Sequence, residues 1–173
     1  AGHSLGEYSA LVAAEALDFA DAVRLVRKRG QYMQEAVPAG VGAMAAILGL
    51  EAQVVQDVCA QAAAAVGEAV EAANFNDPKQ TVIAGTKAGV DRACEMLKAA
   101  GAKRALPLAV SAPFHSSLMK PAAERLRDRL TSVTLNAPSV AVINNIDARV
   151  ENDPAAIREA LYRQAYGAVR WVE

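Results

Sequence analysis

The sequence is poor in cysteine, histidine and aromatic residues. Its 173 residues include two cysteines, two histidines and 5% aromatic side chains. Cys59 and Cys94 lack the spacing of a metal or redox site, so we expect thiols in a reducing cytoplasm rather than a disulfide. No apolar run reaches the roughly 18 residues of a membrane span, and the first residues do not have the pattern of a signal peptide. We therefore expect a cytoplasmic protein that does not enter a membrane.

The sequence also has almost no excess of positive or negative charge. The net charge is −1, which excludes a protein built mainly to hold nucleic acid or an anionic membrane. Apolar residues make up 53% and charged residues 21%, as in ordinary globular domains that bury a core. The length allows one or two domains.

What the chain does have is a serine motif at its start. Gly2-His3-Ser4-Leu5-Gly6 fits G-x-S-x-G, which holds a nucleophilic serine on a sharp turn between a strand and a helix. Only three residues precede Ser4, so the strand that should lead into the turn has no room. Because the first residue is also Ala rather than Met, we expect a fragment of a longer protein that starts at this turn.

The remaining pattern predicts two kinds of structure. Helices are expected at 7–16 and 19–36, and from Gly42 short apolar runs alternate with helical ones. Strands are favoured at 43–50, 69–75, 80–85 and 103–110, with helices at 51–66 and 90–101. This β-α-β-β-α-β order is that of a ferredoxin-like unit, inserted into something else.

After this unit the sequence pattern resembles that of the first 39 residues again. A loop at 111–119 contains His115 and is followed by a helix at 120–133 and a strand at 140–147. Asp153 and Pro154 then predict an N-cap and a first helical position, which open a helix at 154–166.

A serine hydroxyl needs a base, normally histidine, to remove its proton. His3 is adjacent to Ser4 and should point away from it on a tight turn, which leaves His115, although a lone histidine is often only a surface residue. No Asp or Glu stands out as the third member of a triad. A backbone carbonyl can also orient an imidazole.

Arg29 breaks the amphipathic pattern of its helix. On a helical wheel it lies in the middle of the apolar arc, between Leu25 and Met33. An unpaired buried charge is costly, so such an arginine either extends to the surface or meets an anion. The anion is either a structural carboxylate or the carboxylate of a substrate, which the planar guanidinium can hold with two hydrogen bonds.

Five segments together resemble one family along the whole chain, the bacterial malonyl-CoA:acyl carrier protein transacylases. They are "GHSLGEYSAL", "RGQYMQEAVPAG", "NFNDPKQTVIAG", "SAPFHSSLM" and "RQAYGAVRW". The resemblance implies an α/β fold with an α/β-hydrolase-like acyltransferase body, residues 1–39 and 110–173, and an inserted ferredoxin-like subdomain, residues 40–109. The family's N-terminal strand and the turn that completes its oxyanion hole are not in this sequence.

The resemblance also implies roles for matching positions. Ser4 would be the acylated nucleophile and His115 its base, oriented by the main-chain carbonyl of Gln164. The N–H of Leu5 would donate to the oxyanion. Arg29 would hold the malonyl carboxylate, and Phe114 matches a bulky position associated with malonyl over branched acyl groups. Ala168 departs from the family, which usually has proline there.

The implied reaction transfers a malonyl group from malonyl-CoA to acyl carrier protein, with no metal and no cofactor beyond the coenzyme A thioester that is the substrate. We expect a monomer, with the acidic carrier docking on basic residues such as Arg27, Lys28, Lys103 and Arg104. Three alternatives remain: an acyltransferase domain of a polyketide synthase, a serine esterase, and a non-catalytic remnant that only binds carrier protein.

Overall fold

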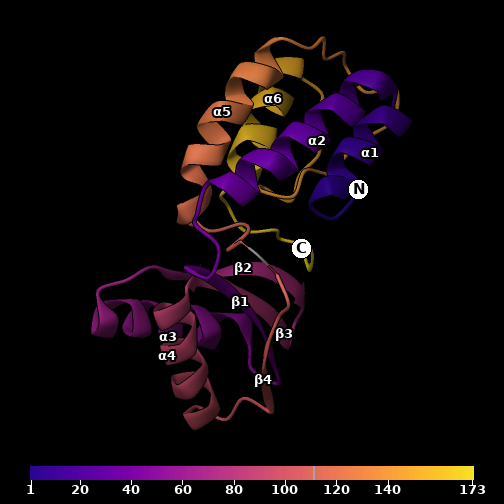
Figure 1. Ribbon diagram of the computed structural model, residues 1–173. Helices are drawn as coiled ribbons and strands as arrows, with labels where there is room; N and C mark the ends of the chain where they lie inside the picture. Colours follow the sequence, from indigo (N-terminus) through magenta and orange to yellow (C-terminus); the bar gives the residue numbers. More distant parts are fainter. Residues whose placement is uncertain (111) are drawn as a thin grey trace.

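The computed structural model describes residues 1–110 and 112–173 and has a mixed α/β architecture with two parts (Figure 1). Its elements, in chain order, are α1 Leu5–Ala13, α2 Phe19–Glu35, β1 Gly42–Leu48, α3 Ala52–Val66, β2 Val70–Asp77, β3 Gln80–Thr86, α4 Lys87–Ala99, β4 Arg104–Pro107, the 3-10 helix Ser117–Met119, α5 Lys120–Thr131 and α6 Pro154–Gln164.

The four strands form one antiparallel sheet in the order β2-β3-β1-β4. Helices α3 and α4 cover one face of it (Figure 1). The side chains alternate as a pleated strand requires: Ala45 and Ile47 of β1 pack with the core under the helices, whereas Met44 belongs to a small cluster on the other face. The ferredoxin-like unit predicted from the sequence is confirmed.

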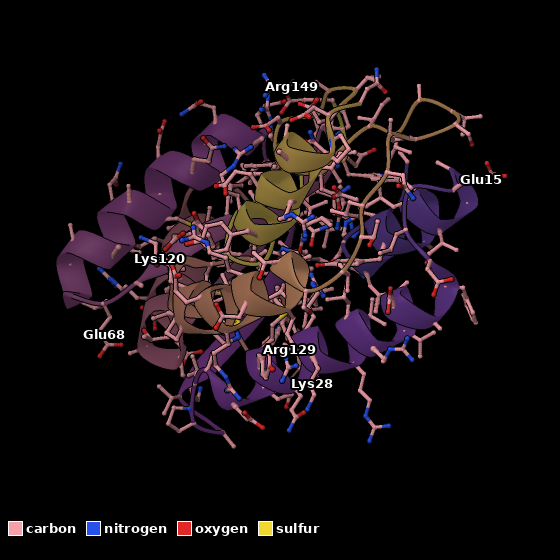
Figure 2. All side chains as sticks on the ribbon, turned by 90° about the horizontal axis from the view of Figure 1, so that it is seen from above. Glu15, Lys28, Glu68, Lys120, Arg129 and Arg149 are labelled. Atoms are coloured by element: carbon pink, nitrogen blue, oxygen red, sulfur yellow. The ribbon has the colours of Figure 1, made fainter. Side chains whose placement is uncertain are left out.

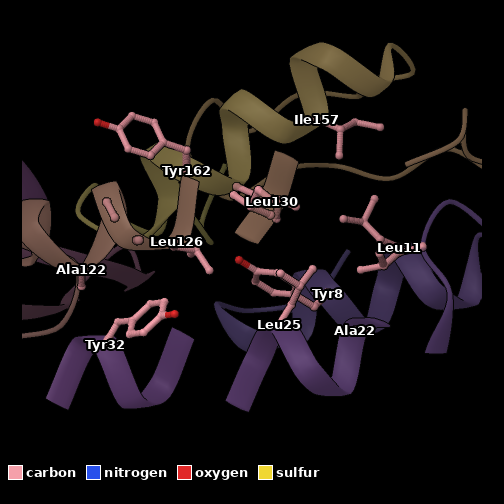
Figure 3. Packing of buried hydrophobic residues seen from close by; sticks show 14 of the residues in the cluster. Tyr8, Leu11, Ala22, Leu25, Tyr32, Ala122, Leu126, Leu130, Ile157 and Tyr162 are labelled. Carbon is pink, nitrogen blue, oxygen red and sulfur yellow. The ribbon is translucent and has the colours of Figure 1, made fainter. Parts of the chain in front are cut away.

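The other part is a layer of helices. Its core is formed by the apolar stripes of α1, α2, α5 and α6, whose labelled side chains face one another in Figure 3. Leu126 and Leu130 of α5 are four residues apart and both buried, as the helical period predicts. At the start of α6, the Asp153 side chain accepts from the N–H of Ala156 at 2.9 Å, so the predicted N-cap is present.

The strand predicted at 140–147 is wrong. The structure has there only an isolated antiparallel bridge between Ile143 and Val150. A strand needs a continuous ladder, and here the backbone makes other bonds: Asn145 donates its N–H to the Glu7 carboxylate at 3.0 Å and accepts from the N–H of Arg170. Within the described residues, the sheet is therefore confined to β1–β4.

Two further differences concern the link between the parts. The strand expected at 103–110 spans only Arg104–Pro107. The Leu108 N–H still donates to the Met44 carbonyl at 2.9 Å, but the Val110 N–H turns back to the Leu108 carbonyl and so does not continue the ladder. The loop expected at 111–119 begins at Ser111, which lies outside the described residues. The boundaries 39/40 and 109/110 stay predictions.

The C-terminal segment ties the parts together. Residue Phe75 of β2 donates its N–H to the carbonyl of Val169 at 2.9 Å and accepts from the N–H of Val172 at 3.0 Å. These bonds hold one end of the sheet beside the start of α1, where the motif serine lies. As for membranes, none of the described helices has the length and apolarity to cross a bilayer.

Candidate active site

Ser4 lies on a strained turn directly before α1. Its φ of 53° and ψ of −109° are values that residues with a Cβ rarely adopt. The turn is closed by the Gly6 N–H, which donates to the His3 carbonyl at 2.9 Å. A Cβ at Gly2 would lie 2.0 Å from the Gly6 carbonyl oxygen, so only glycine fits at that position. The turn predicted from the motif is present.

His115 is brought to this serine from 111 residues further along the chain. Its Nε2 lies 2.7 Å from Ser4 Oγ, and its Nδ1 lies 2.9 Å from the main-chain carbonyl oxygen of Gln164. The carbonyl can only accept, so Nδ1 carries the proton and Nε2 is free to accept from the serine. Burial and the nearby Arg29 lower the pKa of His115 from 6.5 to about 4, which keeps the ring neutral at pH 7.

Arg29 reaches the same point from the buried face of α2. It is only 6% exposed, and its Nη2 donates to Ser4 Oγ at 3.0 Å and to Gln164 Oε1 at 3.1 Å. Both acceptors are neutral, and its buried Nε has no partner in the part of the chain that the structure describes. The structural ion pair considered from the sequence is therefore absent from the described residues, and the positive charge remains available to an anion.

A pocket of about 500 Å³ opens in front of these groups. Ser4, Arg29 and His115 lie in its wall, and Phe114 and Met44 contribute apolar surface. Phe114 is wedged between the helical core and the open face of the sheet. The pocket thus combines one cation, a hydroxyl and a base with a mainly apolar lining, as ligand sites usually do.

Leu5 is placed by its backbone rather than by its side chain, which is half exposed. It is the first residue of α1, so its N–H belongs to the first-turn groups that have no acceptor within the helix. A helix N-terminus also carries partial positive charge. An oxygen anion formed next to Ser4 would meet this N–H.

The other candidates do not join the serine–histidine pair. His3 also lines the pocket, but its Nε2 is 2.9 Å from Asn76 Oδ1 and its ring packs near Trp171. The basic residues Arg27 and Lys28 line a hollow of about 270 Å³ between α2 and the end of α5, where Figure 2 shows Lys28 near Arg129. Lys103 and Arg104 lie in the other part, at the start of β4 (Figure 1), so the four basic residues do not form one patch.

Sequence reasoning missed two residues that support the site. The Glu7 carboxylate is 2% exposed, and its Oε2 accepts from Gln164 Nε2 at 2.8 Å and from the Asn145 N–H at 3.0 Å. The Asn145 side chain in turn accepts from the N–H of Ser4 at 2.6 Å. Burial raises the pKa of Glu7, while these hydrogen bonds and Arg29 oppose that rise. Glu7 lies four residues before Leu11 on the buried face of α1, and this spacing is the sequence signal that could have revealed Glu7.

The arrangement defines a class. A serine with a neutral histidine base, held by a carbonyl rather than a carboxylate and flanked by a helix N-terminus, is a centre for covalent acyl transfer.

Comparison with known proteins agrees with this class. A model described as acyl transferase domain matches residues 1–171, so the chain belongs to the acyl transferase domain family. The malonyl CoA-acyl carrier protein transacylase of Escherichia coli (strain K12) is 58% identical over 100% of this chain and 55% of its own length. The protein of the same name from Bacillus subtilis (strain 168) is 55% identical over 100% of this chain and 54% of its own length.

Solved structures are equally similar. An acyl-carrier-protein S-malonyltransferase from Burkholderia pseudomallei is 63% identical with a TM-score of 0.94, over 98% of this chain and 54% of that one. A malonyl-transacylase in complex with its type II PKS acyl-carrier protein is 53% identical with a TM-score of 0.95, over 98% of this chain and 54% of that one. The chain thus spans about 55% of the length of the relatives it matches.

Proposed function

We propose that the protein transfers a malonyl group from malonyl-CoA to the phosphopantetheine thiol of acyl carrier protein, through a malonyl ester on Ser4. One observation carries the proposal: the guanidinium of Arg29 is buried beside Ser4 Oγ, at 3.0 Å, without a carboxylate partner among the described residues. A buried cation next to a nucleophile favours an acyl group that brings its own carboxylate.

In the first step, Ser4 Oγ attacks the thioester carbonyl while its proton passes to His115 Nε2, 2.7 Å away. The oxygen of the resulting tetrahedral intermediate is placed to accept from the Leu5 N–H. The carbon–sulfur bond then breaks, and the proton on His115 goes to the departing coenzyme A thiolate. The products are malonyl-Ser4 and free coenzyme A.

In the second step, the carrier thiol attacks the same ester carbonyl and gives its proton to His115. The Ser4 oxygen then leaves and takes that proton back, so the enzyme returns to its starting state. The Gln164 carbonyl, 2.9 Å from His115 Nδ1, stabilises the imidazolium that exists in both steps. Among the described residues, His115 Nδ1 is bonded to this carbonyl and not to a carboxylate, which supports a transacylase over a triad esterase.

Selectivity follows from two residues. Arg29 has hydrogen-bond capacity beyond its two neutral acceptors, and a malonyl carboxylate would use it. Phe114 narrows the pocket between Met44 and the helical core, which disfavours acyl groups branched next to the carbonyl.

The test uses the full-length protein, incubated with malonyl-CoA and digested. We expect one malonyl mass on the peptide that contains Ser4, and its loss when carrier protein is added. Label on Cys59, on Cys94 or nowhere would contradict the proposal. A non-catalytic remnant gives no label, and an esterase releases malonate to water without loading the carrier.

A carrier from polyketide synthesis is a second candidate acceptor, because the similar malonyl-transacylase described above is bound to one. Comparing the transfer rate to fatty-acid and polyketide carriers separates the two pathways.

We also propose a cytoplasmic monomer that acts on these partners and not on nucleic acid or membranes. Both cysteines are free thiols, which supports a reducing compartment. The site residues Ser4, Arg29 and His115 all come from one chain. Light scattering of the purified protein measures its mass.

A further inference from the structure

Gln164 forms hydrogen bonds with four residues of the site: Ser4, Glu7, Arg29 and His115. The Gln164 side chain is completely buried, and its amide makes three hydrogen bonds: Nε2 donates to the Ser4 carbonyl at 2.9 Å and to Glu7 at 2.8 Å, and Oε1 accepts from Arg29 at 3.1 Å. Its main-chain carbonyl accepts from His115. The side-chain amide therefore decides where the guanidinium is held.

An amide can turn around in such a place unless its neighbours forbid it. Glu7 Oε2 already accepts from the Asn145 N–H, so this oxygen acts as an acceptor and requires the NH₂ end of Gln164 to face it. The oxygen end must then face Arg29, which only donates. In the reversed orientation, two acceptors would face each other at Glu7 and two donors at Arg29.

We propose that Glu7 is a positioning residue whose carboxyl group, together with the Ser4 carbonyl, fixes the orientation of the Gln164 amide and, through that amide, the place of the Arg29 guanidinium. The inference rests on the proposed function, because its consequence is the preference for acyl groups that carry a carboxylate. Glu7 itself touches neither the serine oxygen nor the pocket: its Oε2 is taken by Gln164 and by the Asn145 N–H.

The geometry offers a matched pair of variants. Both hydrogen bonds at Glu7 end on the same oxygen, Oε2, so Glu7→Gln can keep both with its amide oxygen. Glu7→Met has a similar volume but no oxygen, so the NH₂ end of the Gln164 amide is then held by the Ser4 carbonyl alone. Glu7→Asp keeps the carboxyl group but shortens the side chain by one methylene, so it no longer reaches Gln164. Glu68→Ala is the control, because it removes an exposed carboxylate from the other part of the molecule.

The measurement is the ratio of kcat/KM for malonyl-CoA to that for acetyl-CoA in the full-length protein, with a melting curve for each variant. We expect Glu7→Met and Glu7→Asp to lower the ratio roughly 10- to 100-fold, the scale of one lost charge-assisted hydrogen bond. Glu7→Gln should keep it within about threefold, and Glu68→Ala should not change it.

A purely structural role predicts something else: both substrates lose rate in parallel with the melting temperature, and the ratio stays constant in Glu7→Met and Glu7→Asp. That result would overturn the inference. If Glu7→Met and Glu7→Asp melt too low for assay, Glu7→Ser replaces them, because its side chain is too short to reach Gln164. In that case Glu7→Gln also tests the inference: a tenfold or greater fall in its malonyl-to-acetyl ratio would overturn it. A wild-type protein that forms no malonyl ester on Ser4 contradicts the proposed function itself, an outcome visible before any variant is made.

Discussion

The sharpest consequence of the site concerns Arg29→Ala. The guanidinium is 6% exposed, so its pair with a malonyl carboxylate would form out of water. Removing one partner of a buried pair costs about 3–5 kcal/mol, which is roughly two to four decades in kcat/KM for malonyl-CoA. Acetyl-CoA has no carboxylate and should lose little, because in its complex the cation is buried without an anion.

The same substitution has a second signature at the base. The positive charge of Arg29 is one cause of the low pKa of His115, after burial. In Arg29→Ala the pKa of His115 should therefore rise from about 4 toward 6.5, and acetyl transfer should begin to fail at a higher pH than in the wild type. The loss of malonyl preference and this change in pH dependence have one cause and should occur together.

The assay measures kcat/KM for both thioesters between pH 4 and 8 in the wild type, in Arg29→Ala and in Arg27→Ala, an exposed arginine of the same helix. Arg27→Ala should behave as the wild type. An unchanged malonyl-to-acetyl ratio in Arg29→Ala, with a lowered melting temperature, would show that Arg29 is only structural and would refute the assignment.

Two further predictions follow from the same geometry. Because His115 is buried in its neutral form, its contribution to the free energy of unfolding is fully present above pH 6.5 and falls by roughly 3 kcal/mol as the pH falls from 6.5 to about 4. Chemical denaturation should show this loss in the wild type and a smaller loss in His115→Phe. Gly2→Ala places a Cβ 2.0 Å from the Gly6 carbonyl, so the turn must open and labelling of Ser4 should fall at least 100-fold, whereas Gly30→Ala, which meets nothing within 4 Å, should keep its melting temperature.

Local patterns predicted most of the fold because they describe local causes. The periods of α2 and α5, the N-cap Asp153 and the order of elements from Gly42 are each determined by neighbours a few residues away. The segment 140–147 has the composition of a strand, but the backbone of Asn145 bonds to Glu7 and Arg170, two distant partners that no local pattern reveals. Strand pairing is a long-range property, and composition alone does not supply the partner.

The same distinction applies to the site. Arg29 was visible in the sequence because a charge interrupts an apolar stripe, and Ser4 because its turn has a strict glycine requirement. Glu7 interrupts the stripe of α1 in the same way, yet its meaning depends on Gln164, which lies 157 residues away. A short helix such as α1 also offers few positions from which to judge the buried face, so the exception is harder to recognise there.

In the proposed reaction, the carrier thiol must compete with water for the ester on Ser4. The carboxyl group of Glu7 and the guanidinium of Arg29 are both buried and are bridged by the neutral amide of Gln164, so Arg29 keeps its charge without a carboxylate partner among the described residues. The guanidinium can therefore exchange its bond to Ser4 Oγ for a substrate carboxylate without the site rearranging. Once the acyl group is held at that end, the ester carbonyl is fixed beside His115, and a nucleophile must approach through the apolar wall formed by Phe114. Such a lining disfavours scattered water beside the ester.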